Sequence, residues 1–153
     1  MPDPTQQDLS RHFSNLVGRK VTFEKTLVNS LSKDKKAFAV YKSFPTESLI
    51  VVAADLRFLG SLAGALVGLP DSEVQNRLAK PVLDDLLNDA ISEILNVTSA
   101  AIATEERAVF TQMVLERSGV KDAADAILTK PHRQISFNVT VENYQGGKFQ
   151  VFS

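Results

Sequence analysis

Residues 135–142 read ISFNVTVE, in which apolar and polar side chains alternate without a break. Successive side chains of a β-strand point to opposite faces, so this stretch predicts a strand with one buried face and one polar or wet face. Residues 143–147 end in two glycines and predict a hairpin turn, after which 148–152 form the returning strand. A hairpin of this kind favours antiparallel pairing.

Working outward from this hairpin, the chain divides into two similar halves. A helix that begins at Asp3-Pro4 and ends at Gly18 opens the first half, and the longest helix, from Pro81 to about Thr104, opens the second. Further helices are expected over 56–67 and 72–79, and a turn or short helix over 119–128. The strands are expected over 21–28, 37–44, 48–54, 109–116, 134–142 and 148–152.

This order predicts an α+β fold with one mostly antiparallel sheet of about six strands packed with long helices. Each half reads as a helix followed by three strands, which indicates a pseudo-duplicated architecture. No linker or low-complexity stretch separates the halves, so residues 1–153 are expected to form a single domain.

Composition excludes several classes of protein. Seventeen Lys and Arg against eighteen Asp and Glu give a net charge of −1, so no basic surplus indicates binding to nucleic acid or to an anionic membrane. The chain has no cysteine, which excludes disulfides, cysteine-ligated zinc, iron–sulfur clusters and thiol nucleophiles. The chain has only two histidines, which makes histidine-based metal sites and catalytic triads improbable.

Neither a secretory signal nor a membrane span is expected. Residues 1–7 lack a basic region followed by an apolar one. The longest apolar stretch, 49–69, is interrupted by Asp55 and Arg57, and neither part reaches the ~20 residues that a spanning helix needs. We therefore expect a cytoplasmic protein.

The long helix has a polar line along one side. At about 100° per residue, with Asp89 at zero, Glu93 falls near 40° and Asn96 near −20°, and Ala100 continues the line. Two interpretations of this line are open: it is the ordinary polar face of an amphipathic helix, or it is a functional site. Asparagine within a helix costs roughly 0.6 kcal/mol relative to alanine, which mildly favours a site. The predicted core stripe, between about 60° and 180°, comprises Leu83, Leu86, Leu87, Ala90, Ile94, Thr98 and Ala101.

The motif Asp89-x3-Glu93-x2-Asn96 resembles the pattern Asp/Ser-x3-Glu-x2-Asn of the CheC/CheX/FliY family of bacterial chemotaxis phosphatases. The order of predicted elements resembles that family over essentially the whole chain. Two positions differ from the family pattern. Family members usually have a proline some twenty residues after the Asn, whereas no proline follows here before Pro131, and Ala100 stands where glycine is frequent.

The resemblance implies a phosphatase that acts on the phosphoaspartate of a response-regulator receiver domain, CheY-like, in chemotaxis or two-component signalling. Asn96 would orient the attacking water, Glu93 would pair with a lysine of the receiver domain, and Asp89 would support the contact at its edge. The resemblance implies no cofactor of the chain's own, because the receiver domain supplies the Mg²⁺. The alternative is a non-catalytic binding or adaptor module of the same fold in a chemotaxis or flagellar-switch complex, which the two differing positions favour.

The first helix repeats the motif spacing as Asp8-x3-His12-x2-Asn15, with histidine in place of the glutamate. This is either a coincidence within a polar face or a degenerate second site that has lost its acid.

The resemblance also implies a homodimer with one active helix per subunit, because single-site members of the family form dimers through their sheets. Residues 148–152, KFQVF, are a short apolar strand. At a sheet edge, this strand would expose unpaired backbone groups that a second subunit could cover. The alternative is that the strand lies inside the sheet of a monomer.

Overall fold

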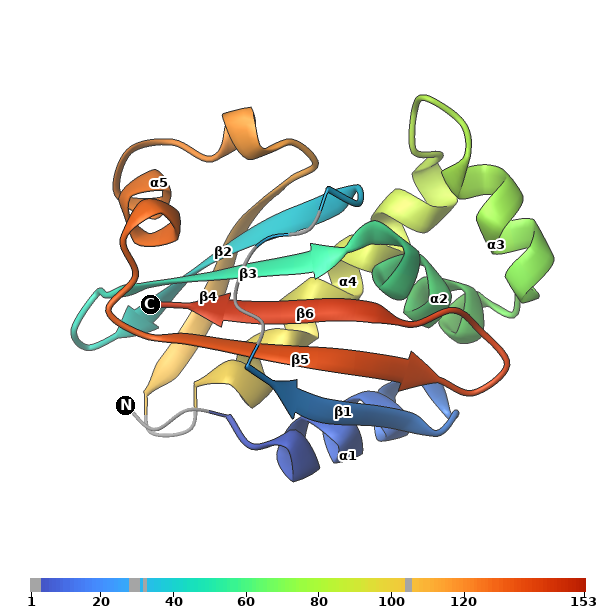
Figure 1. Ribbon diagram of the computed structural model, residues 1–153, viewed down its shortest axis with the longest axis horizontal. Coiled ribbons are helices and arrows are strands. Elements are labelled where there is room, and N and C mark those ends of the chain that lie inside the picture. The colour runs from blue at the N-terminus through green and yellow to red at the C-terminus, as the bar shows by residue number, and fades with distance from the viewer. Residues whose placement is uncertain (1–3, 28–30, 32, 104–105) are drawn as a thin grey trace.

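The computed structural model describes residues 4–27, 31, 33–103 and 106–153, which form one six-stranded sheet and five α-helices (Figure 1). Every pair of neighbouring strands is antiparallel, which confirms the predicted α+β class. The strands are β1 Val21–Thr26, β2 Lys36–Phe44, β3 Leu49–Asp55, β4 Arg107–Val114, β5 Gln134–Val141 and β6 Gly147–Phe152. The helices are α1 Gln6–Val17, α2 Leu56–Val67, α3 Asp71–Leu78, α4 Asp85–Ile102 and α5 Asp122–Thr129, with a short 3₁₀ turn at Arg117–Gly119.

The strand order, β1-β5-β6-β3-β2-β4, has an internal symmetry. If β1 is exchanged with β4, β2 with β5 and β3 with β6, the result is the same order read from the opposite edge of the sheet. Each half also begins with a helix that packs near an edge strand, α1 beside β1 and α4 beside β4. The predicted helix-plus-three-strand halves are therefore related by an approximate two-fold axis at the centre of the sheet.

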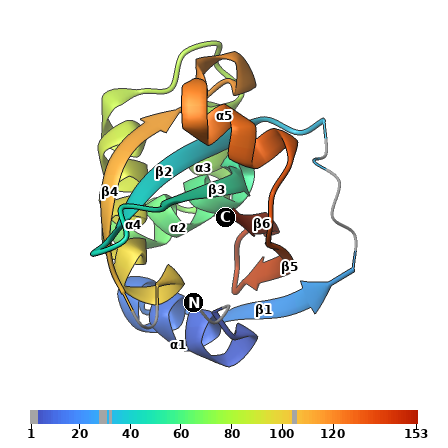
Figure 2. The same cartoon turned by 90° about the vertical axis from the view of Figure 1, so that its left-hand side faces the viewer.

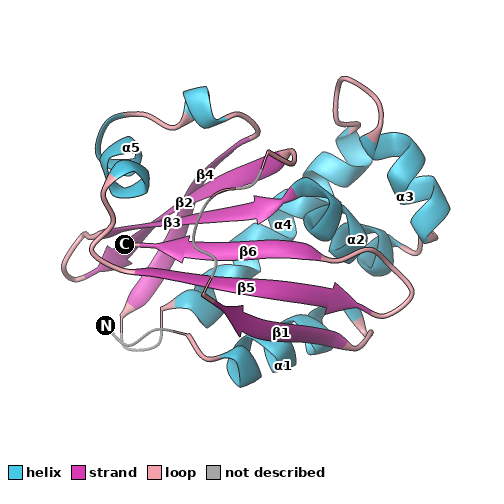
Figure 3. Cartoon of the chain, viewed as in Figure 1, coloured by secondary structure: helices cyan, strands magenta, loops and turns pink. Residues whose placement is uncertain are grey.

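The sheet is covered on both faces (Figures 2 and 3). Helices α1, α2 and α4 pack on one face over a cluster of phenylalanines whose ring centroids lie 5.2 to 6.3 Å apart. On the other face, the α5 segment contributes Val120, Ala124 and Leu128 to a smaller cluster over β2 and β3. Burial on both faces accounts for the continuous apolar run of β3. The phenylalanines are Phe13, Phe23, Phe58, Phe137 and Phe149.

Local capping sets the helix ends. α1 begins at Gln6, and the Thr5 hydroxyl accepts the Asp8 amide at 3.1 Å, whereas the predicted cap Asp3 lies outside the described residues. α1 ends at Val17, and Gly18 is its C-cap, as predicted, with the left-handed φ of 67° that glycine adopts readily. Among the described residues, no helix is long and apolar enough to cross a membrane.

The last strand does not lie at an edge of the sheet. β6 pairs with β5 on one side and with β3 on the other, and both Phe149 and Phe152 are buried. The expectation that a second subunit could cover this strand is therefore wrong. The physical reason is the interlocking of the two halves, which places the β5–β6 hairpin against β3 and leaves β1 and β4 at the edges.

Side chains of α1 close the β1 edge. Three alternate amide groups of β1 donate hydrogen bonds to side chains one helical turn apart on α1. Four residues of helix rise about 6 Å and two residues of strand about 6.7 Å, so the two repeats nearly match. The pairs are Lys25 with Gln6 at 3.0 Å, Phe23 with Ser10 at 2.9 Å and Val21 with Ser14 at 2.9 Å.

A β-bulge interrupts β4 at Thr111. The pairing with β2 passes from Val40 opposite Gln112 to Tyr41 opposite Phe110, which leaves Thr111 as the extra residue. The Thr111 hydroxyl donates to the Val40 carbonyl at 2.9 Å. Because a bulge reverses the alternation of side chains, Phe110 and Met113 both pack against the core on the helical face of the sheet.

Candidate functional site

The polar line predicted for the long helix lies on α4, which packs against β4, α1 and α2. α4 begins at Asp85, four residues later than predicted, because the Asp84 carboxylate accepts the Leu87 amide at 3.0 Å and acts as the N-cap. Arg77 of α3 lies 3.6 Å from the same carboxylate and 2.9 Å from Glu73. These contacts, which raise the pKa of Arg77, chiefly through its hydrogen bond to Glu73, link α3 to the start of α4.

The buried side of α4 is rotated from the predicted stripe. Leu86 was predicted in the core but is 46% exposed, and Leu83 and Ala101 are only partly buried. The prediction missed Ile91, Leu95 and Ile102, which centre the buried side near 170° rather than near 120°. The buried residues are Leu87, Ala90, Ile91, Ile94, Leu95, Thr98 and Ile102.

This rotation places the polar line almost opposite the core. Asp89, Glu93, Asn96 and Ala100 are all exposed, on one side of three successive turns. No ion pair or side-chain hydrogen bond between described residues involves Asp89, Glu93 or Asn96. The carboxylates and the amide are therefore free to meet a partner, and the site is a convex helix face.

The buried side of the same turn is held to the sheet. The Tyr41 hydroxyl of β2 donates to the Leu95 carbonyl at 2.6 Å, and the Thr98 hydroxyl donates to the Ile94 carbonyl at 2.6 Å. Burial raises the pKa of Tyr41 well above its ordinary range, so its hydroxyl keeps the proton that it donates. No periodicity or motif links Tyr41 to Leu95, so the sequence offered no signal for this contact.

The motif on α1 has the same spacing as the motif on α4 but differs in burial and in chemistry. Asp8 and Asn15 are exposed, whereas His12 is half-buried, with its ring centroid 5.0 Å from that of Phe13 in an edge-to-face arrangement. Burial lowers the pKa of His12, so the imidazole is neutral at pH 7 and supplies no negative charge where α4 has Glu93.

The two motifs also differ in their height on the helix. Asn15 lies two residues before the last residue of α1, and Asn96 lies six residues before the last residue of α4. Four residues of helix correspond to about 6 Å, so the two asparagines do not occupy symmetric places along their helices.

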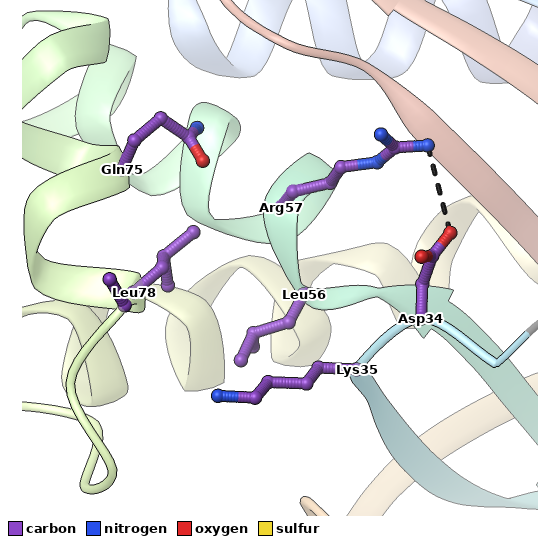
Figure 4. A pocket seen from close by; sticks show the side chains of 7 residues that line it. Asp34, Lys35, Leu56, Arg57, Gln75 and Leu78 are labelled. Carbon is purple, nitrogen blue, oxygen red and sulfur yellow. Dashed lines mark ion pairs between the residues drawn. The ribbon is translucent and has the colours of Figure 1, made fainter.

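Well-formed pockets lie away from the α4 line. One, of about 300 Å³, lies between the start of α2, α3 and the segment before β2. Asp34 and Arg57, whose charged groups lie 3.8 Å apart, line this pocket together with Leu56 and Leu78 (Figure 4). None of Asp89, Glu93 and Asn96 lines this pocket, so the candidate site suits a macromolecular surface rather than an enclosed small molecule.

Within the part of the chain that the structure describes, no group of three or more His, Asp and Glu side chains could hold a metal ion. The supply of Mg²⁺ by a receiver domain stays a prediction.

The comparisons with known proteins identify the fold. No family model and no curated protein sequence matches the chain. FliM from a FliG–FliM complex of H. pylori is similar over 97% of this chain and 86% of its own, with a TM-score of 0.61 and 13% identity. The FliM middle domain from H. pylori is similar over 96% and 84%, with a TM-score of 0.58 and 14% identity.

FliY from Thermotoga maritima is similar over 99% of this chain and 85% of its own chain, with a TM-score of 0.56 and 13% identity. At these identities the likeness concerns the fold. The chain has the fold of FliY and of the FliM middle domain, which confirms at the level of the fold its resemblance to the CheC/CheX/FliY family.

Proposed function

We propose that this protein is a phosphatase that hydrolyses the phosphoaspartate of a response-regulator receiver domain in the cytoplasm. The observation that supports the proposal most is that Glu93 and Asn96 lie side by side on one exposed face of α4. Both side chains are exposed on one face of α4, and neither has a side-chain hydrogen bond or ion pair with another described residue. A carboxylate and an amide one turn apart can enter the active site of a partner together.

Hydrolysis of a phosphoaspartate requires few catalytic groups from the phosphatase. An acyl phosphate is already activated, and phosphoryl transfer depends mostly on positioning and charge stabilisation. The Asn96 amide has one acceptor and two donors and holds a water in line with the breaking P–O bond, while the receiver domain supplies Mg²⁺ and a lysine. Glu93 pairs with that lysine, and Asp89 supports the contact one turn away.

The direct test measures the lifetime of phosphorylated receiver domains with and without the protein. A panel of receiver domains is phosphorylated with a small-molecule phosphodonor, the donor is removed, and the loss of phosphoaspartate is followed. A catalytic amount of the protein is expected to shorten the lifetime of at least one receiver domain. Unchanged lifetimes across a panel that includes a bound receiver domain would contradict the phosphatase.

The second candidate is a non-catalytic adaptor of the same fold. It is favoured by Ala100 and by the absence of a proline between Asn96 and Pro131, the two departures from the family pattern. Stoichiometric binding of a phosphorylated receiver domain without any loss of its phosphoryl group would support the adaptor.

Replacing Glu93 with alanine is expected to weaken docking more than the chemical step. Glu93 supplies the negative charge of the contact, and charge-assisted pairs at a desolvated interface contribute affinity and fix the orientation of the partners. Titration calorimetry with a receiver domain that carries an acyl-phosphate mimic should show a dissociation constant raised by about tenfold or more. An unchanged dissociation constant would remove this role.

We also propose a homodimer formed through β4. The outer edge of β4 forms no hydrogen bond with the described residues, whereas α1 closes the β1 edge. Residues 108–115 have no charged side chain, and Arg107 and Glu116 flank them. Antiparallel pairing of two copies would bring Arg107 of each copy near Glu116 of the other.

Light scattering at micromolar concentration should give twice the mass of one 16.7 kDa chain. Gln112 is exposed on β4, and changing it to lysine would place a positive charge on each of the two paired β4 strands. Repulsion between these charges should prevent pairing, so this variant should have the mass of a single chain. A single-chain mass for the unaltered protein would contradict the dimer.

A further inference from the structure

The turn of α4 that contains Glu93 and Asn96 is held from behind by two buried hydroxyl groups. Residues 94 and 95 lie between Glu93 and Asn96, and the carbonyls of both accept a side-chain hydrogen bond of 2.6 Å. In an α-helix each of these carbonyls also accepts the amide four residues on, so both have two donors. The two extra bonds occur at the turn where the candidate catalytic side chains leave the helix.

The donor from the sheet, Tyr41, is itself fixed in place. Tyr41 is fully buried, and its ring centroid lies 5.6 Å from that of Phe110 on the neighbouring strand. Tyr41 and Phe110 face each other at the register change that the Thr111 bulge creates. Bulges re-aim side chains, and this one lies beside the tyrosine that reaches α4.

Asn96 depends on this support because its own side chain has no hydrogen-bond partner among the described residues. Its position is therefore set by the backbone of α4. Thr98 sets the local geometry of the helix at Ile94, and Tyr41 fixes the height and rotation of the helix at Leu95 relative to the sheet. A water-orienting group misplaced by about 1 Å can lose on the order of 100-fold in rate.

From this geometry we infer that Tyr41 and Thr98 are positioning residues, which hold Asn96 at the place from which it orients the attacking water. The inference rests on the proposed phosphatase function and adds to it two residues that never touch the substrate.

Tyr144 provides a matched control for Tyr41. Its hydroxyl also donates to a backbone carbonyl, that of Leu69, at 2.6 Å, but it lies in the turn between β5 and β6. Changing either tyrosine to phenylalanine removes one hydroxyl and one hydrogen bond of the same length. We expect Tyr41→Phe to lower the turnover of a saturating phosphorylated receiver domain by about 10- to 100-fold. Tyr144→Phe should stay within about twofold of the unaltered protein.

The affinity for a receiver domain with an acyl-phosphate mimic separates positioning from folding. Tyr41→Phe should bind it within about twofold of the unaltered protein, because Glu93 still docks. A lower turnover at unchanged affinity is not what a merely structural tyrosine would produce.

Thr98 allows a second comparison within one position. Thr98→Ser keeps the hydroxyl and should keep turnover within about twofold, whereas Thr98→Val removes the hydroxyl and should lower turnover by about tenfold. A threonine bond to the carbonyl four residues back does not favour helix stability, so Thr98→Val should lower turnover without lowering the denaturation midpoint.

The outcomes distinguish this inference from the proposed function. If the unaltered protein leaves every receiver domain phosphorylated, the phosphatase proposal fails and the inference fails with it. If the unaltered protein is active and Tyr41→Phe loses no more turnover than Tyr144→Phe, only the inference is overturned. Equal activity of Thr98→Val and Thr98→Ser would remove Thr98 from the inference.

Discussion

Replacing Asn96 with alanine should lower receiver dephosphorylation by one or more orders of magnitude while the protein stays folded. The side chain is exposed and bonded to no described residue, so its removal breaks no contact within the fold. Alanine is the better helix former by roughly 0.6 kcal/mol, so α4 should be slightly more stable. Under the proposed mechanism the rate should fall because the Asn96 amide places the water, and lost positioning acts directly on the chemical step. Single-turnover decay of a phosphorylated receiver domain measures it.

The matched control is Asn15→Ala on α1. Asn15 is also exposed and has the same motif spacing. Its replacement should leave the decay rate unchanged, because the neutral His12 supplies no anion beside it. A folded Asn96→Ala protein with full activity would remove the catalytic assignment. Equal losses in both variants would assign activity to both helices.

The sequence predicted which face of α4 carries the candidate site better than it predicted which face of α4 is buried. Asp89, Glu93 and Asn96 fall on one exposed face, as their spacing predicted. The predicted core stripe was rotated, because periodicity alone does not show that α4 packs against β4, α2 and α1, and Ile91 and Leu95 are buried in this arrangement.

Contacts between residues far apart in the sequence could not be predicted from local sequence patterns. Residues 148–152 read as a strand in either position, and only the interlocking of the two halves makes β6 interior. The Tyr41 hydroxyl meets the Leu95 carbonyl across 54 residues of sequence. The closure of β1 by Ser10 and its neighbours depends on a helix lying alongside a strand edge, which no periodicity encodes.

Replacing Asp55 with alanine should destabilise the fold by about 3 to 5 kcal/mol, the usual cost of removing one partner of a buried ion pair. Asp55 is 1% exposed and Lys36 is 5% exposed, with 2.6 Å between the carboxylate and the ammonium. The second carboxylate oxygen accepts the Lys148 amide at 2.8 Å. Asp55 thus joins β2, β3 and β6 at the start of α2, and its loss removes both the carboxylate beside the buried Lys36 ammonium and the acceptor of the Lys148 amide. Urea unfolding followed by circular dichroism measures the change.

Two further variants assign the loss to the buried charge. Asp125→Ala breaks the partly exposed pair of Asp125 with Arg117, 2.6 Å apart, and should cost no more than about 1 kcal/mol. The double change Lys36→Met with Asp55→Leu removes both buried charges and should recover much of the stability that Asp55→Ala loses. A double variant no more stable than Asp55→Ala would show that the lost Lys148 hydrogen bond, rather than the lost contact with the Lys36 ammonium, dominates. An Asp55→Ala loss below about 1 kcal/mol would contradict the role of the pair, because the Lys36 charge would then be compensated without the Asp55 carboxylate.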